Sequence, residues 1–273
     1  MRILIRTSKW AIWARRFGSL ALPLAIIPVF LHRERLITSV DFSIIEMIAM
    51  AIAALAMFLA IGAFVRLWIT GDQGWSKATT GFFLSLLCLL PLAFLFLLTL
   101  RYPAVADVSS DPTNPPGIVS QVPPSGLAPV ERAAIETAFP NARNRTYPIE
   151  AAEMFALVRT LVEARGWEPR AQREPQTPLA EGQINAVSMT LLGWRDEVGI
   201  RIEGDPQGSI VAMRSVSLHP GHDLGENGRR IEEFLTALDE RVTVILRDVP
   251  LGPVAPTDDS EPEEVEDEGG AEG

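Results

Sequence analysis

The residues best suited to chemistry lie near the last apolar alternation of the chain. In the stretch 210–216 every second residue is apolar except Arg214, so a cation falls on an otherwise apolar face of a predicted strand. A buried charge needs a partner, and the nearest acids by sequence are Asp196 and Asp223. Arg214 therefore either ties the edge of the sheet to an acid or to backbone carbonyls, or helps to bind an anion.

The anion-binding hypothesis adds Arg230 and the first N–H groups of the last predicted helix to Arg214. Guanidinium groups and helix N-termini both bind carboxylate or phosphate. Gly221, Gly225 and Gly228 surround the start of this helix, but they match neither the dinucleotide-binding nor the Walker pattern. Turn glycines at a loop-to-helix junction are the more ordinary interpretation.

Three possible metal ligands, His219, His222 and Asp223, occur within five residues. Zinc requires three or four ligands, the single cysteine, Cys88, lies in an apolar segment, and Asp223 is expected to cap a helix. We therefore expect no metal site and no cofactor, with the two histidines as weak metal candidates. No nucleophile–base pair is recognisable, so no catalytic residue is predicted.

Charge restricts the partners. The formal net charge is −10, but residues 252–273 contain nine acidic and no basic side chains, which leaves −1 for all other residues. A near-neutral body without a basic stripe argues against nucleic-acid binding. The acidic tail lacks aromatic residues and is predicted to be disordered.

Three apolar stretches in residues 1–101 predict membrane-spanning helices. Residues 81–100 are twenty residues without a charge, enough to cross a hydrocarbon core of about 30 Å. Residues 44–65 form a second span, and residues 17–31 a shorter first one that contains two prolines. A charged stretch follows the first span where a signal peptide would have a small-residue cleavage site, so we expect this span to be retained.

Basic residues in the short flanking segments predict the orientation. With the N-terminus in the cytoplasm, seven lysines and arginines lie inside and three outside. The soluble half is then extracytoplasmic, which in a bacterium with two membranes means an inner-membrane protein with a periplasmic domain. No ionisable residue lies in the middle of a span, which favours a membrane anchor over a transporter.

The soluble half predicts an α+β domain. Residues 102–148 contain nine prolines and are predicted to form an extended strap with a short helix at 130–138. A helix at 149–165 precedes strands at 184–193, 198–203 and 209–218, with a turn at 204–208. A last helix at 224–242 begins with Asp223 as N-cap and Glu226 in a capping box.

These elements predict a two-layer α/β sandwich, in which an antiparallel sheet of about four strands packs on two helices. The expected organisation is a three-helix transmembrane region at 1–101, the strap at 102–148, the soluble domain at 149–251 and the acidic tail at 252–273.

Several motifs of the soluble half resemble a known bacterial family. They are ADVSSDPTNPP, a helix ending in RGW, GQINAVSMTLLGWRDEVGIRIE and GSIVAMRSVSLHPGHDLGENGRRIEEFLTAL. Together they resemble domain of unknown function 1499 (DUF1499) over about residues 107–238, which implies a domain without an assigned activity. The family's recurring residues correspond here to Asp107, Asp111, Pro115, Pro116, Trp167, Asp196, Arg201, Arg214, Ser215, Ser217, Asp223, Gly225, Asn227 and Arg230.

Two classes of function follow. The first is a non-enzymatic binding or scaffold module of the cell envelope, anchored in the membrane and contacting an envelope protein or a lipid. The alternative is a membrane-anchored hydrolase, or an enzyme for a small anionic ligand, that uses the region of Arg214, Asp223 and Arg230. The candidate ligand-binding residues are Arg214, Asp223, Asn227 and Arg230.

Overall fold

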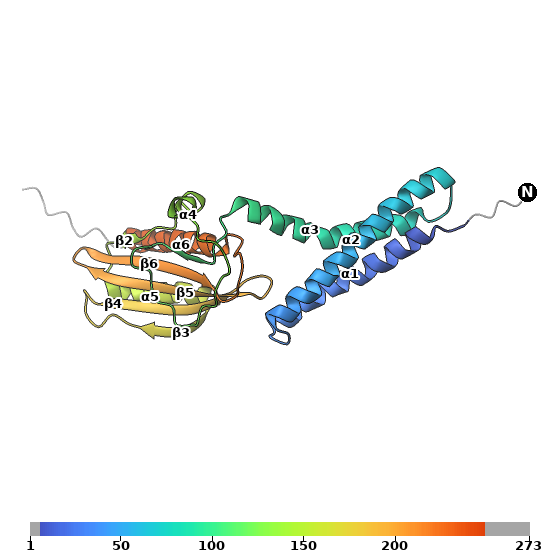
Figure 1. Ribbon diagram of the computed structural model, residues 1–273. Helices are drawn as coiled ribbons and strands as arrows, with labels where there is room; N and C mark the ends of the chain where they lie inside the picture. The colour runs from blue at the N-terminus through green and yellow to red at the C-terminus, as the bar shows by residue number, and fades with distance from the viewer. Residues whose placement is uncertain (1–5, 249–273) are drawn as a thin grey trace, which may run out of the picture.

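The computed structural model describes residues 6–248 (Figure 1). Three helices are followed by an antiparallel sheet with further helices. This arrangement confirms the predicted α+β class with its apolar N-terminal region. The predicted acidic tail, 252–273, lies outside the described residues.

The N-terminal helices are α1 (Lys9–Arg33), α2 (Ser39–Thr70) and α3 (Trp75–Arg101), and all three are long and apolar enough to cross a membrane. Each extends beyond its predicted apolar stretch. Small residues allow the helices to pack closely. The buried side chains of α2 are mostly alanines: Phe42, Ala49, Ala53, Ala56, Ala60, Ala63 and Leu67.

The second half of α3 leaves this bundle. Its buried residues are Ala78, Gly81, Ser85 and Cys88, and none of residues 89–100 is buried. Figure 1 shows α3 diverging from the α1–α2 hairpin and reaching the soluble domain separately. Pro91, which cannot donate a helical hydrogen bond, lies within this half.

The sheet has six strands rather than about four. The strands are β1 (Asp107–Ser109), β2 (Arg145–Tyr147), β3 (Glu168–Arg173), β4 (Glu181–Met189), β5 (Arg195–Asp205) and β6 (Gly208–Ser217). Their order is β1-β6-β5-β4-β3, with β2 also paired to β6, and every pairing is antiparallel. The predicted hairpin is confirmed as β5–β6. The additional strands are β1 and β2, of three residues each, and β3, which is exposed along its whole length.

Helices α5 (Ala151–Ala164) and α6 (Glu226–Asp248) cover one face of the sheet, and the short α4 (Arg132–Ala138) lies beside α6 (Figure 1). Gly166, with φ of 65°, follows the last turn of α5 and ends the helix. The core between helices and sheet includes Phe155, Val158, Ile184, Ile200, Ile202, Met213, Phe234 and Leu238.

The other face of the sheet is covered by residues 110–120, the part of the predicted strap that follows β1. Below, the name strap is kept for residues 110–120 alone. The alternation in β5 separates the two faces, because Val198, Ile200 and Ile202 are in the helix-side core while Glu197 and Arg201 bond to the strap. The segment 102–148 also supplies β1, β2 and the core residues Val108 and Tyr147. It is thus an integral part of the folded domain.

The domain contacts its own apolar helices at two junctions. At the first, the β4–β5 turn meets the end of α1: the His32 ring bonds the Leu192 carbonyl at 2.8 Å, and Arg33 donates to the Leu191 carbonyl at 2.8 Å. Gly193, with φ of 89°, leaves no room for a side chain, since a Cβ there would lie 2.9 Å from the His32 ring. At the second junction, Tyr102 after α3 stacks on Phe139.

Candidate functional site

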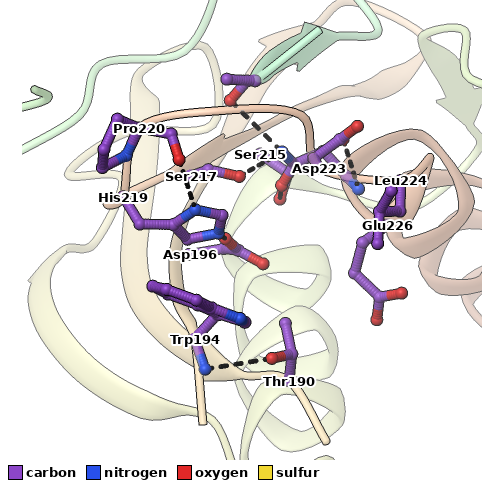
Figure 2. Close-up of polar contacts among 12 residues, drawn as sticks. Thr190, Trp194, Asp196, Ser215, Ser217, His219, Pro220, Asp223, Leu224 and Glu226 are labelled. Atoms are coloured by element: carbon purple, nitrogen blue, oxygen red, sulfur yellow. Dashed lines mark hydrogen bonds and ion pairs between the residues drawn. The ribbon is translucent and has the colours of Figure 1, made fainter. Parts of the chain in front are cut away.

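A cluster of buried polar side chains lies at the end of the sheet that faces the apolar helices. It is built from the start of β5, the end of β6 and the first turns of α6 (Figure 2). Its members are Asp196, Ser215, Ser217, Asp223, Asn227 and Arg230, each at most 7% exposed. Residues 196, 215 and 217 share a face because β5 and β6 pair Asp196 with Ser217.

Arg230 is the centre of this polar cluster. Its Nη2 donates to Asp196 Oδ2 at 2.7 Å, and its Nη1 donates to Ser215 Oγ at 2.8 Å and to Asn227 Oδ1 at 2.9 Å. The Ser215 hydroxyl donates in turn to Asn227 Oδ1 at 2.7 Å. A buried guanidinium with these partners is stabilised, because its charge is paired and both of its Nη atoms donate hydrogen bonds.

Asp223 holds the start of α6. Its two carboxylate oxygens accept from the N–H groups of Gly225 at 2.9 Å and Asn227 at 3.0 Å. Burial raises the pKa of Asp223, and the two N–H bonds oppose that rise. The predicted cap is therefore present, but the capping box is not reciprocal. The N–H of Asp223 donates to the Val105 carbonyl, and Glu226 pairs with Arg229 at 2.6 Å.

One atom of the cluster has no hydrogen bond. Asp196 Oδ1 is buried without a hydrogen-bond partner, and the His219 Nε2 lies 3.8 Å away. Figure 2 shows the rings of His219 and Trp194 beside the Asp196 carboxylate. Trp194 packs against His219 with ring centroids 4.5 Å apart and against His32 of α1 at 4.9 Å. The polar cluster thus adjoins the first junction with the apolar helices.

The two histidines have separate surroundings. His222 Nδ1 accepts from the Leu224 N–H at 2.9 Å, and its Nε2 lies 3.3 Å from the Tyr102 carbonyl. His219 instead faces Asp196 and Trp194. Within residues 6–248, no group of three His, Cys, Asp or Glu side chains is arranged to hold a metal ion.

Arg214 lies on the opposite face of the sheet from Arg230. Its Nε and Nη2 donate to the two carboxylate oxygens of Asp107 at 2.9 and 2.6 Å, and this bidentate pair raises the pKa of Arg214. The expected partners, Asp196 and Asp223, are on the helix side. The structure therefore joins Asp223, Asn227 and Arg230, and it separates Arg214 from them by the thickness of the sheet.

An ion pair between Arg201 of β5 and Asp111 of the strap holds the strap on the sheet. Arg201 donates to Asp111 Oδ2 at 2.8 Å and to the Asn114 carbonyl at 2.8 Å. Burial alone would raise the pKa of Asp111, but bonds from Thr113, the Asn114 N–H, Asn144 and Arg201 lower it to about 2. Arg201 and Asp111 are both among the recurring residues that the family resemblance implies.

Glu197 completes this strap-side set and was not anticipated from the sequence. Its side chain is fully buried, and its oxygens accept from the N–H groups of Val119 at 2.7 Å and Ser120 at 2.8 Å and from Asn185 at 3.0 Å. The signal that could have found it is the period of two in β5, because Glu197 directly precedes Val198 and so faces away from Val198, Ile200 and Ile202, toward whatever covers the other side of the sheet.

Two cavities adjoin the candidate residues. One of about 260 Å³ lies beside Arg230 and is lined by Arg165, Trp167, Ser188, Glu226, Arg229 and Glu233 as well. Another of about 560 Å³ lies on the far side of β6, between the strap and α4, and includes Asp107 and Arg214. The two arginines that were expected to share one pocket thus line different cavities.

The geometry of the polar cluster favours holding elements together over catalysis. The Ser215 hydroxyl donates to Asn227 and accepts from Arg230, and neither partner can act as a general base. Asp223 uses both oxygens on backbone N–H groups. The remaining free acceptor is Asp196 Oδ1, which is enclosed.

A family model, described as protein of unknown function (DUF1499), matches residues 107–238. No curated protein and no solved structure matches the chain. The matched region begins with β1 and ends within α6, so it contains all six strands, the strap and the polar cluster. Residues 107–238 therefore match the DUF1499 family, and in this chain they follow three apolar helices.

Proposed function

We propose that the protein is an integral protein of the inner membrane that presents its DUF1499 domain outside the cytoplasm as a non-enzymatic binding or scaffold module. The observation that carries this proposal is the internal use of the polar cluster. Arg230 is engaged by Asp196, Ser215 and Asn227, and Asp223 caps α6. Residues that could have served a reaction instead fix the domain's own framework.

The two junctions support a scaffold role, because they hold the domain against its anchor. The first joins the β4–β5 turn to α1 through His32 and Arg33, and the second joins Tyr102 to Phe139. A domain held at two points presents one defined surface to an envelope protein or to lipid. The orientation rests on three spans and on the seven-to-three distribution of basic residues.

Reporter fusions test the location. A reporter that is active only outside the cytoplasm should be active after Leu251 and silent at Gly74, between α2 and α3. The reversed pattern would place the domain in the cytoplasm. Photocrosslinking from the exposed domain in native membranes then tests binding, and the proposal expects a discrete adduct to a protein or a lipid.

The alternative is an enzyme or binding protein for a small anion, and the cavity beside Arg230 favours it. Arg165, Arg229 and Arg230 line this cavity together with Ser188. Phosphate, sulfate and small carboxylates should raise the melting temperature of the full chain if the cavity binds anions. The scaffold proposal expects no such rise, and a rise lost in Arg165→Gln would favour the alternative.

A further inference from the structure

A groove of about 930 Å³ lies where α3 reaches the domain. Leu100, Arg101 and Tyr102 at the end of α3 form one side, Ala133 and Ala134 of α4 form another, and α6 contributes Arg229 and Glu232. Figure 1 shows α4 above α6 on the side where α3 arrives. The groove thus starts at the last residues of a helix apolar enough to cross a membrane.

The wall of the groove is well packed. The Tyr102 ring stacks on Phe139 with centroids 5.5 Å apart and an interplanar angle of 2°. The guanidinium of Arg229 lies 5.8 Å from the centroid of the same ring, and the Tyr102 carbonyl contacts His222. The groove is therefore bounded by packed side chains rather than by a loose linker.

Charge in the groove is unevenly compensated. Arg229 pairs with Glu226 at 2.6 Å, and Glu232 accepts from the Asn141 N–H at 2.8 Å. Arg101 lies over the Tyr102 ring at 5.5 Å, and no carboxylate of residues 6–248 lies within ion-pair distance of it. Arg101, at the α3 side of the groove, is thus the groove cation without an ion-pair partner among residues 6–248, and the carboxylate of Glu232 lies on the α6 side.

The position of Arg101 at the end of α3 indicates which kind of anion it would meet. It is the last residue of α3, and the apolar residues 89–100 before it are unburied and lead directly to the groove. At the end of a membrane span, this position coincides with the phosphate layer of the bilayer. Guanidinium groups bind phosphate through parallel hydrogen bonds.

We propose that this groove binds the head group of an anionic phospholipid, with Arg101 contacting the phosphate and α4 forming the opposite wall. The acyl chains then lie along the second half of α3. This inference rests on the membrane insertion in the proposed function and makes lipid a specific partner of the junction. It does not depend on which side of the membrane the domain occupies, since both leaflets contain phosphate.

The test uses the full-length protein in detergent, with lipid binding measured by native mass spectrometry. The probes are phosphatidylglycerol and the zwitterionic phosphatidylcholine. Arg101→Gln removes the cation, and Ala134→Glu places a carboxylate in the groove at an exposed helical position. The matched controls are Arg66→Gln, an exposed arginine near the end of α2, and Ala156→Glu, an exposed position on α5.

The expected result is about fivefold weaker phosphatidylglycerol binding in Arg101→Gln and Ala134→Glu, with both controls equal to the wild type. Phosphatidylcholine should bind more weakly than phosphatidylglycerol, and the two groove substitutions should change its binding little. Equal losses of phosphatidylglycerol binding in Arg101→Gln and Arg66→Gln would overturn the proposed lipid site, because any arginine at the membrane interface would then suffice. Unchanged binding in both groove variants would also overturn it. Reporter fusions at Leu251 and Gly74 are read separately, so a wrong orientation and a wrong lipid site give different results.

Discussion

On the face of the sheet covered by α5 and α6, the buried acid of the strands, Asp196, pairs with a side chain, whereas on the strap face the buried charges of the strands also hold backbone groups. Arg230 meets Asp196, Ser215 and Asn227 on the helix side. On the strap side, Glu197 accepts from two backbone N–H groups, and Arg201 donates to a backbone carbonyl.

This difference follows from what covers each face. A helix satisfies its own backbone and brings only side chains and its first N–H groups to the sheet. The proline-rich strap has neither a helix nor a long ladder to bond its peptide groups, so charged side chains of the sheet must serve them. The helix-side cluster fixes α6 beside the anchor, and the strap-side charges secure an irregular segment.

The largest effect is expected for Arg230→Met. This change leaves Asp196 buried without its cation, which should lower the free energy of unfolding by about 3–5 kcal/mol. Chemical denaturation in detergent, followed by tryptophan fluorescence, measures the change. Arg229→Met is the matched control, because its pair with Glu226 is partly exposed and should contribute below about 1 kcal/mol.

The double variant Asp196→Asn with Arg230→Met tests the cause. Neutralising the buried acid should restore part of the stability lost in Arg230→Met. A double variant as unstable as the sum of the two single variants would show that the pair does not act as a coupled unit.

An intermediate effect is expected from the ionisation of Asp111 on the strap face. Its folded pKa of about 2 lies below the ordinary 3.8, so ionisation stabilises the fold above about pH 4. That contribution, about 2 kcal/mol, should be lost as the pH falls from 4 to 2. Asp111→Asn should therefore show a smaller loss of stability over this range than the wild type.

Stability measured at several pH values makes this comparison. Glu163→Gln, an exposed carboxylate at the end of α5, is the control and should follow the wild type. A wild-type loss no larger than that of Asp111→Asn would contradict the role of Asp111.

The smallest effect is expected for Arg214→Lys. Lysine keeps the charge but cannot make the bidentate pair with Asp107, and both side chains are partly exposed. The loss in free energy of unfolding should be about 0.5–1 kcal/mol, without any ligand present. If the variant keeps wild-type stability but loses an anion-induced rise in melting temperature, Arg214 belongs to a ligand site in the cavity that it lines.

Apolar patterning predicted most of the fold. The period of two in β5 and β6, the apolar face of α5 and the Asp223 cap all identify their elements. The strands β1, β2 and β3 carry no such pattern, because two are three residues long and the third is exposed throughout. β1 and β2 pair with the free edge of β6, and β3 pairs with the free edge of β4.

The structure brings together three of the four candidate ligand-binding residues, and their binding of a ligand stays a prediction. Asp223, Asn227 and Arg230 do come together, since short spacing on one helix start places them on the same side. Arg214 was grouped with them although it faces the strap, because sequence spacing does not say which face of the sheet a helix covers. The partner of Arg214, Asp107, is distant in sequence and joins it only through the pairing of β1 with β6.

The central claim is that the soluble domain is held on the chain's own apolar helices, and a distance measurement across the first junction tests it most directly. Spin labels would be placed at Leu36, in the α1–α2 loop, and at Gln207, in the far turn of the sheet, in a Cys88→Ser background. Both positions are exposed. Double electron–electron resonance in lipid nanodiscs should give one narrow distance distribution, which Trp194→Ala should broaden. A broad distribution for the protein with Trp194 intact would contradict the claim and indicate a domain tethered flexibly to its anchor.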